Sequence, residues 1–331
     1  AMEMATLPVR EDLSRAWRAI SAEIDPNGDA DEMTARRLAE SFAAYLKACK
    51  LDERALSTLP PGRFLMPGDL EGSPALTFAP IDLSPGAEAP PGSLHAMMAR
   101  RFEAYKERVV RPFFRDHFAR LDRQIVLIDV LAALNAGPAA LADLEAALDG
   151  ILAAFRIGRD SWLGALFRHR IDKVLFAATK ADHLHHASHD RLEAILRRLV
   201  ERALARAEST GTEIDVVALA AVRATREASV KRGRTTMPAI IGVPEAGQHG
   251  ADAFDGLAEA AVFPGDLPDN PAALFDPTLG FRGLSDAEGG DFRFLRFRPP
   301  LVMRNAEGLP LALPHIRLDR ALDFLLGDRL R

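Results

Sequence analysis

The middle of the chain carries three short, predominantly apolar runs, at residues 124–129, 173–178 and 214–219. Helical periodicity fills the intervals, at residues 141–155 and 191–207. Unbroken apolar runs are typical of strands buried on both faces, and strands that alternate with helices predict a parallel sheet. We therefore expect an α/β fold whose sheet is covered by helices, with a binding crevice at the carboxyl ends of the strands.

The second apolar run ends abruptly in Thr179-Lys180-Ala181-Asp182. This tetrapeptide fits the N-K-x-D pattern with which P-loop GTPases recognise guanine, except that Thr takes the first place. An Asp carboxylate accepts hydrogen bonds from both the ring N1–H and the exocyclic amine of guanine, a charge-assisted pair that adenine does not offer. We expect Asp182 to supply specificity, Lys180 to lay its aliphatic stem along the base, and Thr179 to brace the loop.

A segment of small residues follows the third apolar run, at the position where a GTPase places backbone amides against the guanine O6. We expect the region of Ala221, Val222 and Arg223 to offer such an amide and to complete the guanine-binding set. Tetrapeptides of this composition are also common at strand-to-helix turns that bind nothing. The buried strand before the motif and the helix after it favour a guanine site.

No residues for phosphate chemistry accompany this motif. The chain has no G-x-x-x-x-G-K-[ST] loop and no Gly-Lys dipeptide, so the backbone cradle for phosphates is missing. Asp129 ends the first apolar run, where an acidic residue can be a magnesium partner. Without a phosphate for magnesium to bridge, we favour a role for Asp129 in shaping the strand exit, and we predict no catalytic residue.

Four histidines crowd behind the motif, at positions 183, 185, 186 and 189, with Asp190 adjacent. Imidazoles at i and i+4, such as His185 and His189, can share a metal ion on one helix face. Because no cysteine and no H-E-x-x-H arrangement accompanies them, we favour histidines that hydrogen-bond the backbone or line the pocket. We predict no metal site, and a zinc or nickel site is the alternative.

Composition excludes several classes of protein. The chain has 331 residues, 48% of them hydrophobic and 27% charged, with a net charge of −5. A mildly acidic chain lacks the concentrated basic face that nucleic-acid binding needs. The single cysteine, Cys49, fits a reducing compartment. No apolar run approaches the ~18 residues of a membrane span, and the start has no signal-peptide pattern, so we expect a cytoplasmic protein.

Three regions are predicted along the chain: a helical segment with a Pro/Gly-rich loop at 1–94, the C-terminal part of a nucleotide domain at 95–230, and a small mixed appendage at 231–331. The first region contains a helix from Asp31 to Lys50. A helix from His95 to Leu121 follows, with a kink or a boundary near Arg111 because Pro112 lies inside the pattern. The appendage carries strand patterns and a final helix, at residues 238–243, 261–263, 292–297 and 315–326.

Several long runs resemble proteins of the YcjX type, which are predicted P-loop GTPases of proteobacteria linked to stress response. The resemblance covers nearly the whole chain from about residue 10. The runs are Arg101–Phe114, Asp122–Asp129, Phe176–Leu184, Phe263–Pro268 and Pro314–Arg320. The resemblance implies a P-loop GTPase-like parallel sheet, binding of GTP or GDP with Mg²⁺, slow hydrolysis, and conformational switching toward a protein partner.

The chain departs from that family at its beginning. Members of the family start with a strand and a G-x-x-x-x-G-K-[ST] loop, followed by a D-x-P-G segment, and this chain lacks both motifs. We expect an N-terminally truncated sheet in which the strand at 124–129 has no inner neighbour. The chain alone is then not expected to hydrolyse GTP. The alternative is a non-catalytic protein-interaction module on a relic of the fold.

Overall fold

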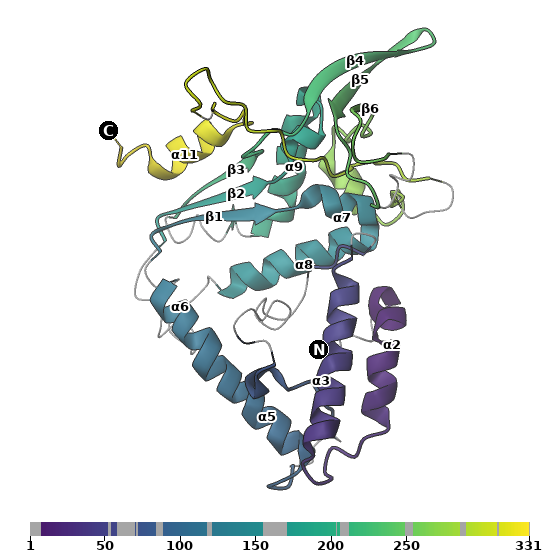
Figure 1. Cartoon of the computed structure of the whole chain (residues 1–331), viewed down its shortest axis with the longest axis vertical. Coiled ribbons are helices and arrows are strands. Elements are labelled where there is room, and N and C mark those ends of the chain that lie inside the picture. The colour runs from purple at the N-terminus through teal and green to yellow at the C-terminus, as the bar shows by residue number, and fades with distance from the viewer. Residues whose placement is uncertain are drawn as a thin grey trace. The chain divides into compact units, whose positions relative to one another are not determined.

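The computed structural model describes most of the chain, namely residues 8–51, 54–57, 70, 72–83, 89–117, 121–154, 171–202, 204–205, 212–248, 254–284, 289–309 and 311–330. These residues belong to two compact units (Figure 1). The first comprises Ala1–Arg120 and Arg159–Arg168, and the second comprises Leu121–Gly158 and His169–Arg331. Each unit is described by itself, and the division into 1–94, 95–230 and 231–331 stays a prediction.

The first unit is helical. Its helices are α2 (Pro8–Ala22), α3 (Glu32–Cys49), α5 (Leu94–Tyr105) and α6 (Arg111–His117), with a 3₁₀ turn at Pro74–Leu76. Helix α3 confirms the predicted helix, and the Asp31 carboxylate caps it by accepting the Thr34 N–H. Trp17 of α2 stacks on Tyr45 of α3 with ring centroids 5.5 Å apart, so an aromatic cluster joins the two helices.

A π-helical turn, Lys106–Val110, separates α5 from α6. Pro112 has no N–H to donate to the carbonyl four residues earlier, and its ring would clash with that carbonyl in a regular helix. A widened turn just before Pro112 relieves this conflict, since π-bulges are a common cause of helix distortion. The predicted boundary near Arg111 is confirmed. Leu121, the predicted end of this helix, is not helical, and residues 118–120 lie outside the described residues.

The second unit is built on a parallel sheet of three strands, in the order β1 (Arg123–Ile128), β2 (Lys173–Ala178) and β3 (Glu213–Ala218). The strands pair in register, with Ile125 beside Leu175 and Leu175 beside Asp215. All three strands therefore end at the same edge of the sheet. The predicted α/β class is confirmed, and the sheet is compatible with a P-loop-like fold.

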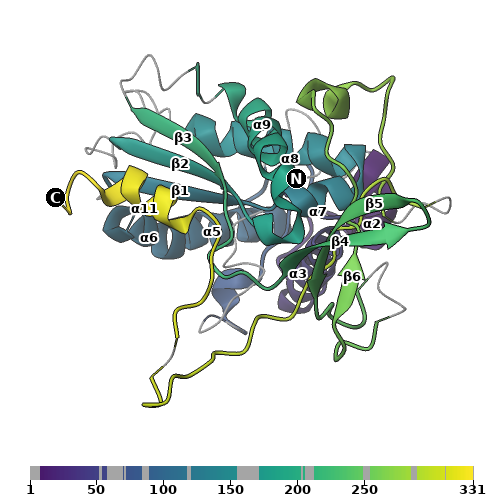
Figure 2. The ribbon, with the colours of Figure 1, turned by 90° about the horizontal axis from the view of Figure 1, so that it is seen from above.

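Helices cover this sheet on both sides (Figure 2). Helices α7 (Val130–Ala136) and α8 (Pro138–Ala154) follow β1, and α9 (His189–Leu199) connects β2 to β3 and packs on them. On the opposite face, Ala321 of α11 (Leu318–Leu326) packs into a cluster formed by Leu175, Ala177, Val217 and Leu219. The final helix begins three residues later than predicted, because Ile316 pairs with Ala220 as an isolated bridge.

Strand β1 forms one edge of this sheet. Among the residues that the structure describes, β1 pairs with β2 and with no other strand. Ile125 and Leu127 lie on the face that α11 covers in β2 and β3, yet their side chains are 38% and 62% exposed. The cover that α11 gives to β2 and β3 therefore does not extend to these two residues of β1.

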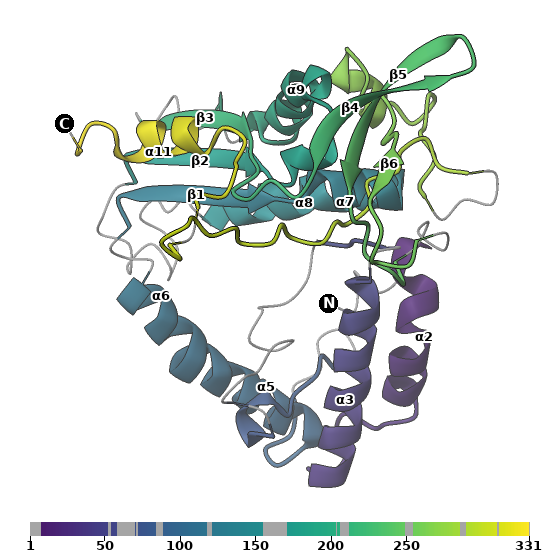
Figure 3. The ribbon, with the colours of Figure 1, turned by 45° about the horizontal axis from the view of Figure 1, so that its top comes forward.

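A second, antiparallel sheet contains β4 (Arg226–Arg232), β5 (Thr235–Gly242) and β6 (Ala260–Val262). The β4–β5 hairpin projects away from the parallel sheet (Figure 3). Strands near 238–243 and 261–263 were predicted, whereas β4 was not, because its sequence R-E-A-S-V-K-R is mostly polar. The predicted strand at 292–297 is wrong: apart from an isolated bridge between Phe297 and Pro244, this segment is irregular.

Candidate functional site

The loop after β2 is tied to both neighbouring strands. The Thr179 N–H donates to the carbonyl of Ile128, at the end of β1, over 2.9 Å, and the Thr179 hydroxyl lies 3.3 Å from the same oxygen. On the other side, the Ala181 N–H donates to the carbonyl of Leu219 over 3.1 Å, just after β3. Thr179 therefore ties the loop to the strand beside it.

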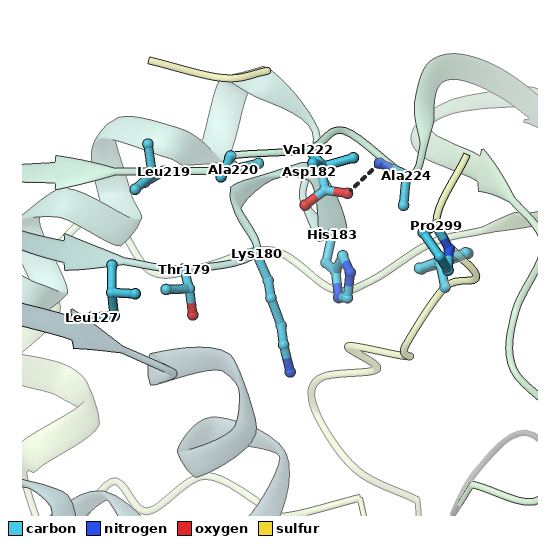
Figure 4. A pocket seen from close by; sticks show the side chains of 12 residues that line it. Leu127, Thr179, Lys180, Asp182, His183, Leu219, Ala220, Val222, Ala224 and Pro299 are labelled. Carbon is cyan, nitrogen blue, oxygen red and sulfur yellow. Dashed lines mark hydrogen bonds between the residues drawn. The ribbon is translucent and has the colours of Figure 1, made fainter. Parts of the chain in front are cut away.

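Lys180 stands in the left-handed backbone region, with φ 62° and ψ 33°. This conformation turns the chain sharply into a 3₁₀ turn, Ala181–His183, directly after the strand. Residues other than glycine and asparagine rarely adopt this backbone conformation, because the β-carbon comes close to the following carbonyl oxygen. The sharp turn brings the Lys180 and Asp182 side chains to the same pocket (Figure 4).

Asp182 is buried, with only 4% of its surface exposed. Its Oδ2 accepts a hydrogen bond of 2.8 Å from the N–H of Ala224, in the loop after β3 (Figure 4). Its backbone carbonyl accepts a second bond from the hydroxyl of Thr225. The other carboxylate oxygen, Oδ1, has no hydrogen bond to any described residue, so it remains available to a ligand that donates.

Asp129 and Lys180 form an ion pair at the same edge of the sheet. The Nζ of Lys180 lies 2.6 Å from Oδ2 of Asp129. The other oxygen of Asp129 accepts the N–H of Ala132 over 3.1 Å and caps α7. Asp129 therefore follows β1 and shapes its exit, as the favoured interpretation predicted. One of its carboxylate oxygens contacts Lys180, and the other caps α7.

Thr179, Lys180 and Asp182 border a pocket of about 300 Å³. That volume is at the lower end of the range for small-ligand sites, roughly 300–1,000 Å³. Apolar side chains make up most of the wall, with a few polar groups converging on it. The lining residues are Leu127, Thr179, Lys180, Asp182, His183, Leu219, Ala220, Ala221, Val222, Ala224, Phe297 and Pro299.

Five of the six residues in the predicted guanine-binding set line this pocket, and Arg223 does not. The Arg223 N–H donates to the carbonyl of Pro314 over 2.7 Å, and its guanidinium contacts the carbonyl of Thr225 and the carboxylate of Glu227. By contrast, the N–H groups of Ala221 and Val222 have no acceptor within the described part of the chain. Those two amides are the ones open to a ligand.

Two of the four histidines are buried around the motif. The ring of His183 meets Phe297 edge to face, with centroids 5.3 Å apart, and burial lowers the pKa of His183. His189 lies 2.9 Å through its Nε2 from the carbonyl of Ala181, and burial also lowers the pKa of His189. The Nε2 of His189 thus contacts a backbone carbonyl, and His189 is not part of the group of possible metal ligands that contains His185.

The whole sequence is similar to a known family of proteins. A model of the YcjX-like family matches residues 1–330. The chain belongs to the YcjX-like family. It is similar to the Ras-like GTPase YcjX of Escherichia coli strain K12, with 37% identity over 328 residues. It is also similar to the Ras-like GTPase YcjX of Shewanella oneidensis strain MR-1, with 31% identity over 307 residues.

The aligned regions differ in how much of each protein they cover. They include 97% and 91% of this chain, but 65% and 59% of the two relatives. This member of the YcjX-like family therefore spans less than two thirds of the length of the curated relatives it matches. The resemblance that the sequence indicated is confirmed. In the described residues, no helix has both the length and the hydropathy of a membrane span.

Sequence reasoning missed the part of the pocket that this YcjX-like chain supplies from far along the sequence. Phe297 and Pro299 come from the C-terminal segment, more than a hundred positions after Asp182. Leu127 comes from the open edge strand β1. A pattern of residue types near the motif carries no signal for these partners, because only the tertiary arrangement of the second unit brings them to the wall.

Proposed function

We propose that this chain contains the guanine-recognising part of a YcjX-like GTPase. The single observation that carries the proposal is the state of Asp182. Its carboxylate is buried at the pocket wall, one oxygen is fixed by the Ala224 N–H, and the other has no partner among the described residues. A buried carboxylate with an open oxygen strongly favours a ligand that donates hydrogen bonds. The N1–H and amine of guanine are such donors.

The other polar groups of the pocket suit the remaining parts of the base. The amides of Ala221 and Val222 are open for the guanine O6, and the stem of Lys180 can lie along the face of the ring. The ion pair with Asp129 holds the Lys180 ammonium group at one end of that stem. Thr179 contributes through the loop, since both of its contacts go to the Ile128 carbonyl.

Phosphate binding and hydrolysis stand apart from base recognition. The curated relatives are described as Ras-like GTPases, so GTP or GDP with Mg²⁺ is the cofactor we propose for the family fold. The residues that normally surround the β- and γ-phosphates in such enzymes form a G-x-x-x-x-G-K-[ST] loop, which this sequence lacks. We therefore propose that this chain recognises the base and does not hydrolyse GTP. A stress-linked switching role stays a prediction.

Calorimetric titration of the purified chain tests this proposal. We expect GDP and guanosine to bind with similar affinity, because the contacts lie at the base, and ADP and adenosine to bind at least tenfold more weakly. Equal affinity for GDP and ADP, or no binding of guanosine and GDP, would contradict base recognition. Magnesium-dependent release of phosphate from GTP by a preparation free of other GTPases would contradict the absence of hydrolysis.

A further inference from the structure

We propose that His185, His186 and Glu227 bind one divalent transition-metal ion, for which Zn²⁺ is the probe. The three residues come from two segments, the loop after Asp182 and the start of β4. One ligand atom from each residue lies within 4.8 Å of the others. This group is outside the guanine pocket, whose lining includes none of the three.

The distances between these atoms are close to those of a tetrahedral zinc site. The Nδ1 of His186 lies 2.5 Å from Oε2 of Glu227, and the Nε2 of His185 lies 3.8 Å from the same oxygen. Zinc bonds to nitrogen and oxygen of about 2.0–2.2 Å place tetrahedral ligands about 3.3 Å apart. Shifts of about an ångström in these side chains bring both distances to that value.

Hydrogen bonds around the cluster position Glu227. Its Oε1 accepts a hydrogen bond of 3.1 Å from the Nη2 of Arg223, so Oε2 is the oxygen that can bind the ion. The carboxylate is thereby held in the manner of a ligand with an outer partner, as metal-binding carboxylates usually are. His185 makes one opposing contact, since its Nδ1 accepts the Ala187 N–H over a long 3.4 Å. Binding through Nε2 requires that weak contact to break.

Exposure differs among the ligands in a way that suits reversible binding. The side chains of His185 and Glu227 are 18% and 23% exposed, whereas that of His186 is 67% exposed. An ion can therefore reach the site from the solvent, and His186 can close on it. With three protein ligands, a fourth position is left for water, as in zinc sites with an open position.

The ligand types select the class of ion. Two imidazole nitrogens and one carboxylate oxygen suit zinc, and also nickel or cobalt, while Mg²⁺ prefers sites made entirely of oxygen. A bound ion would join the loop after Asp182 to the beginning of β4, three residues beyond Ala224. The site thus differs in position and chemistry from any magnesium that accompanies a nucleotide, and the proposal does not depend on guanine binding.

Calorimetric titration with zinc chloride tests the site. The chain is prepared without a polyhistidine tag, freed of metal with a chelator that is then removed, and titrated in excess Mg²⁺. We expect one Zn²⁺ to bind per chain. His186→Ala and Glu227→Gln are each expected to weaken binding at least tenfold, and His315→Ala, which removes an exposed histidine far along the chain, to leave it unchanged.

Thermal unfolding of the same samples provides a second readout. Zn²⁺ is expected to raise the unfolding midpoint of the unaltered chain and of His315→Ala, but not of His186→Ala, because an ion stabilises only the state that binds it. Because His186 is exposed, its replacement by alanine is expected to leave the fold intact, and circular dichroism checks this. Glu227→Gln, which keeps the size of the side chain, supplies an independent test of the same site.

Two results would overturn the inference. One is the absence of saturable zinc binding by the unaltered chain, and the other is binding that persists at full strength in both His186→Ala and Glu227→Gln. GDP titration of these samples separates the two proposals. If the chain binds zinc but not GDP, the metal site is supported and the proposed function is contradicted. If it binds GDP but not zinc, the proposed function is supported and the metal site is contradicted.

Discussion

The ammonium nitrogen of Lys180 and the Oδ2 of Asp129 lie 2.6 Å apart, across the carboxyl ends of β1 and β2. Because the second Asp129 oxygen caps α7 through the Ala132 N–H, the helix start fixes the carboxylate, and the carboxylate in turn fixes the lysine. The direction of the Lys180 stem is therefore set by a residue from the neighbouring strand and helix.

Asp129→Asn tests this arrangement. Asparagine also caps helices well, so α7 is expected to persist. The pair is partly exposed, at 38% and 35%, so the free energy of unfolding should change by less than about 1 kcal/mol. The affinity for GDP should fall about threefold to tenfold because the lysine stem loses its fixed direction. Unchanged affinity in calorimetry would show that the pair does not position Lys180 for binding.

Asp182→Asn is expected to change the base that the pocket prefers. The asparagine oxygen can keep the bond from the Ala224 N–H, while its amide becomes a donor where the carboxylate accepted. The donor groups of guanine then face the donating amide of the asparagine, and the affinity for GDP should fall at least tenfold. Xanthine, which carries a carbonyl in place of the guanine amine, should bind better than guanine. Titrations with GDP and xanthosine diphosphate measure both changes.

A variant that loses affinity for both nucleotides equally would argue against recognition by Asp182. The matched control is Asp269→Asn, on a carboxylate that is 87% exposed and pairs with Arg191. This control makes the same chemical change outside the pocket lining, so it should leave both affinities unchanged.

Burial of His183 makes stability depend on pH. Burial lowers the pKa of His183, and the positive charge of Lys180 adds to this, while the carboxylates of Asp182, Asp129 and Glu245 oppose it. The unfolded histidine, with a pKa of about 6.5, therefore takes up a proton before the folded one. Stability from this group is full above pH 6.5 and is lost as the pH falls below that value.

Urea unfolding at pH 7.5 and pH 5.5 measures this loss. Carboxylates with lowered pKa, such as Asp328 at about 2, stay ionised over this interval and do not contribute to the difference. His183→Gln should reduce the difference between the two pH values. The same difference in the variant would assign the effect elsewhere, and His189, whose pKa is also lowered by burial, is then the next residue to replace.

Glu193 joins α11 to the sheet through several polar contacts. Its carboxylate accepts bonds from Arg317 and Arg320 and from the N–H of Ala218, at the end of β3. Since the Glu193 side chain is only 14% exposed, Glu193→Gln should lower the free energy of unfolding by about 1–3 kcal/mol.

Asp269→Asn is again the matched control for urea unfolding, because its exposed pair with Arg191 should contribute less than about 1 kcal/mol. Equal destabilisation by Glu193→Gln and Asp269→Asn would mean that the contacts of Glu193 with α11 add little to the stability of this unit.

Local sequence was sufficient for much of this fold. The three parallel strands were predicted because each is a short, predominantly apolar run, and Thr179–Asp182 was found because its chemistry lies within four consecutive residues. Strand β4 was missed because its sequence, R-E-A-S-V-K-R, is mostly polar and contains no apolar run. The segment at 292–297 was misjudged because its aromatic residues are buried without pairing as a strand, apart from the isolated bridge at Phe297.

The details of the site depend on tertiary structure that no local pattern encodes. The pairing of Asp129 with Lys180 requires the register of β1 against β2. The hydrogen bond from Arg223 to Pro314, which removes one of the amides considered for guanine O6, requires the C-terminal segment to lie beside this loop. Phe297 joins the pocket for the same reason.

The left-handed backbone conformation of Lys180 lowers the stability of the fold at a residue that the proposed guanine site uses. A lysine in this conformation costs roughly 1–2 kcal/mol that glycine would avoid, and the exposed ion pair with Asp129 returns less than that. Variants selected for thermal stability alone should thus drift toward glycine at this position and lose the stem that we propose to pack on the base. Retention of lysine here despite that cost would be expected if the proposed binding of guanine depends on its stem.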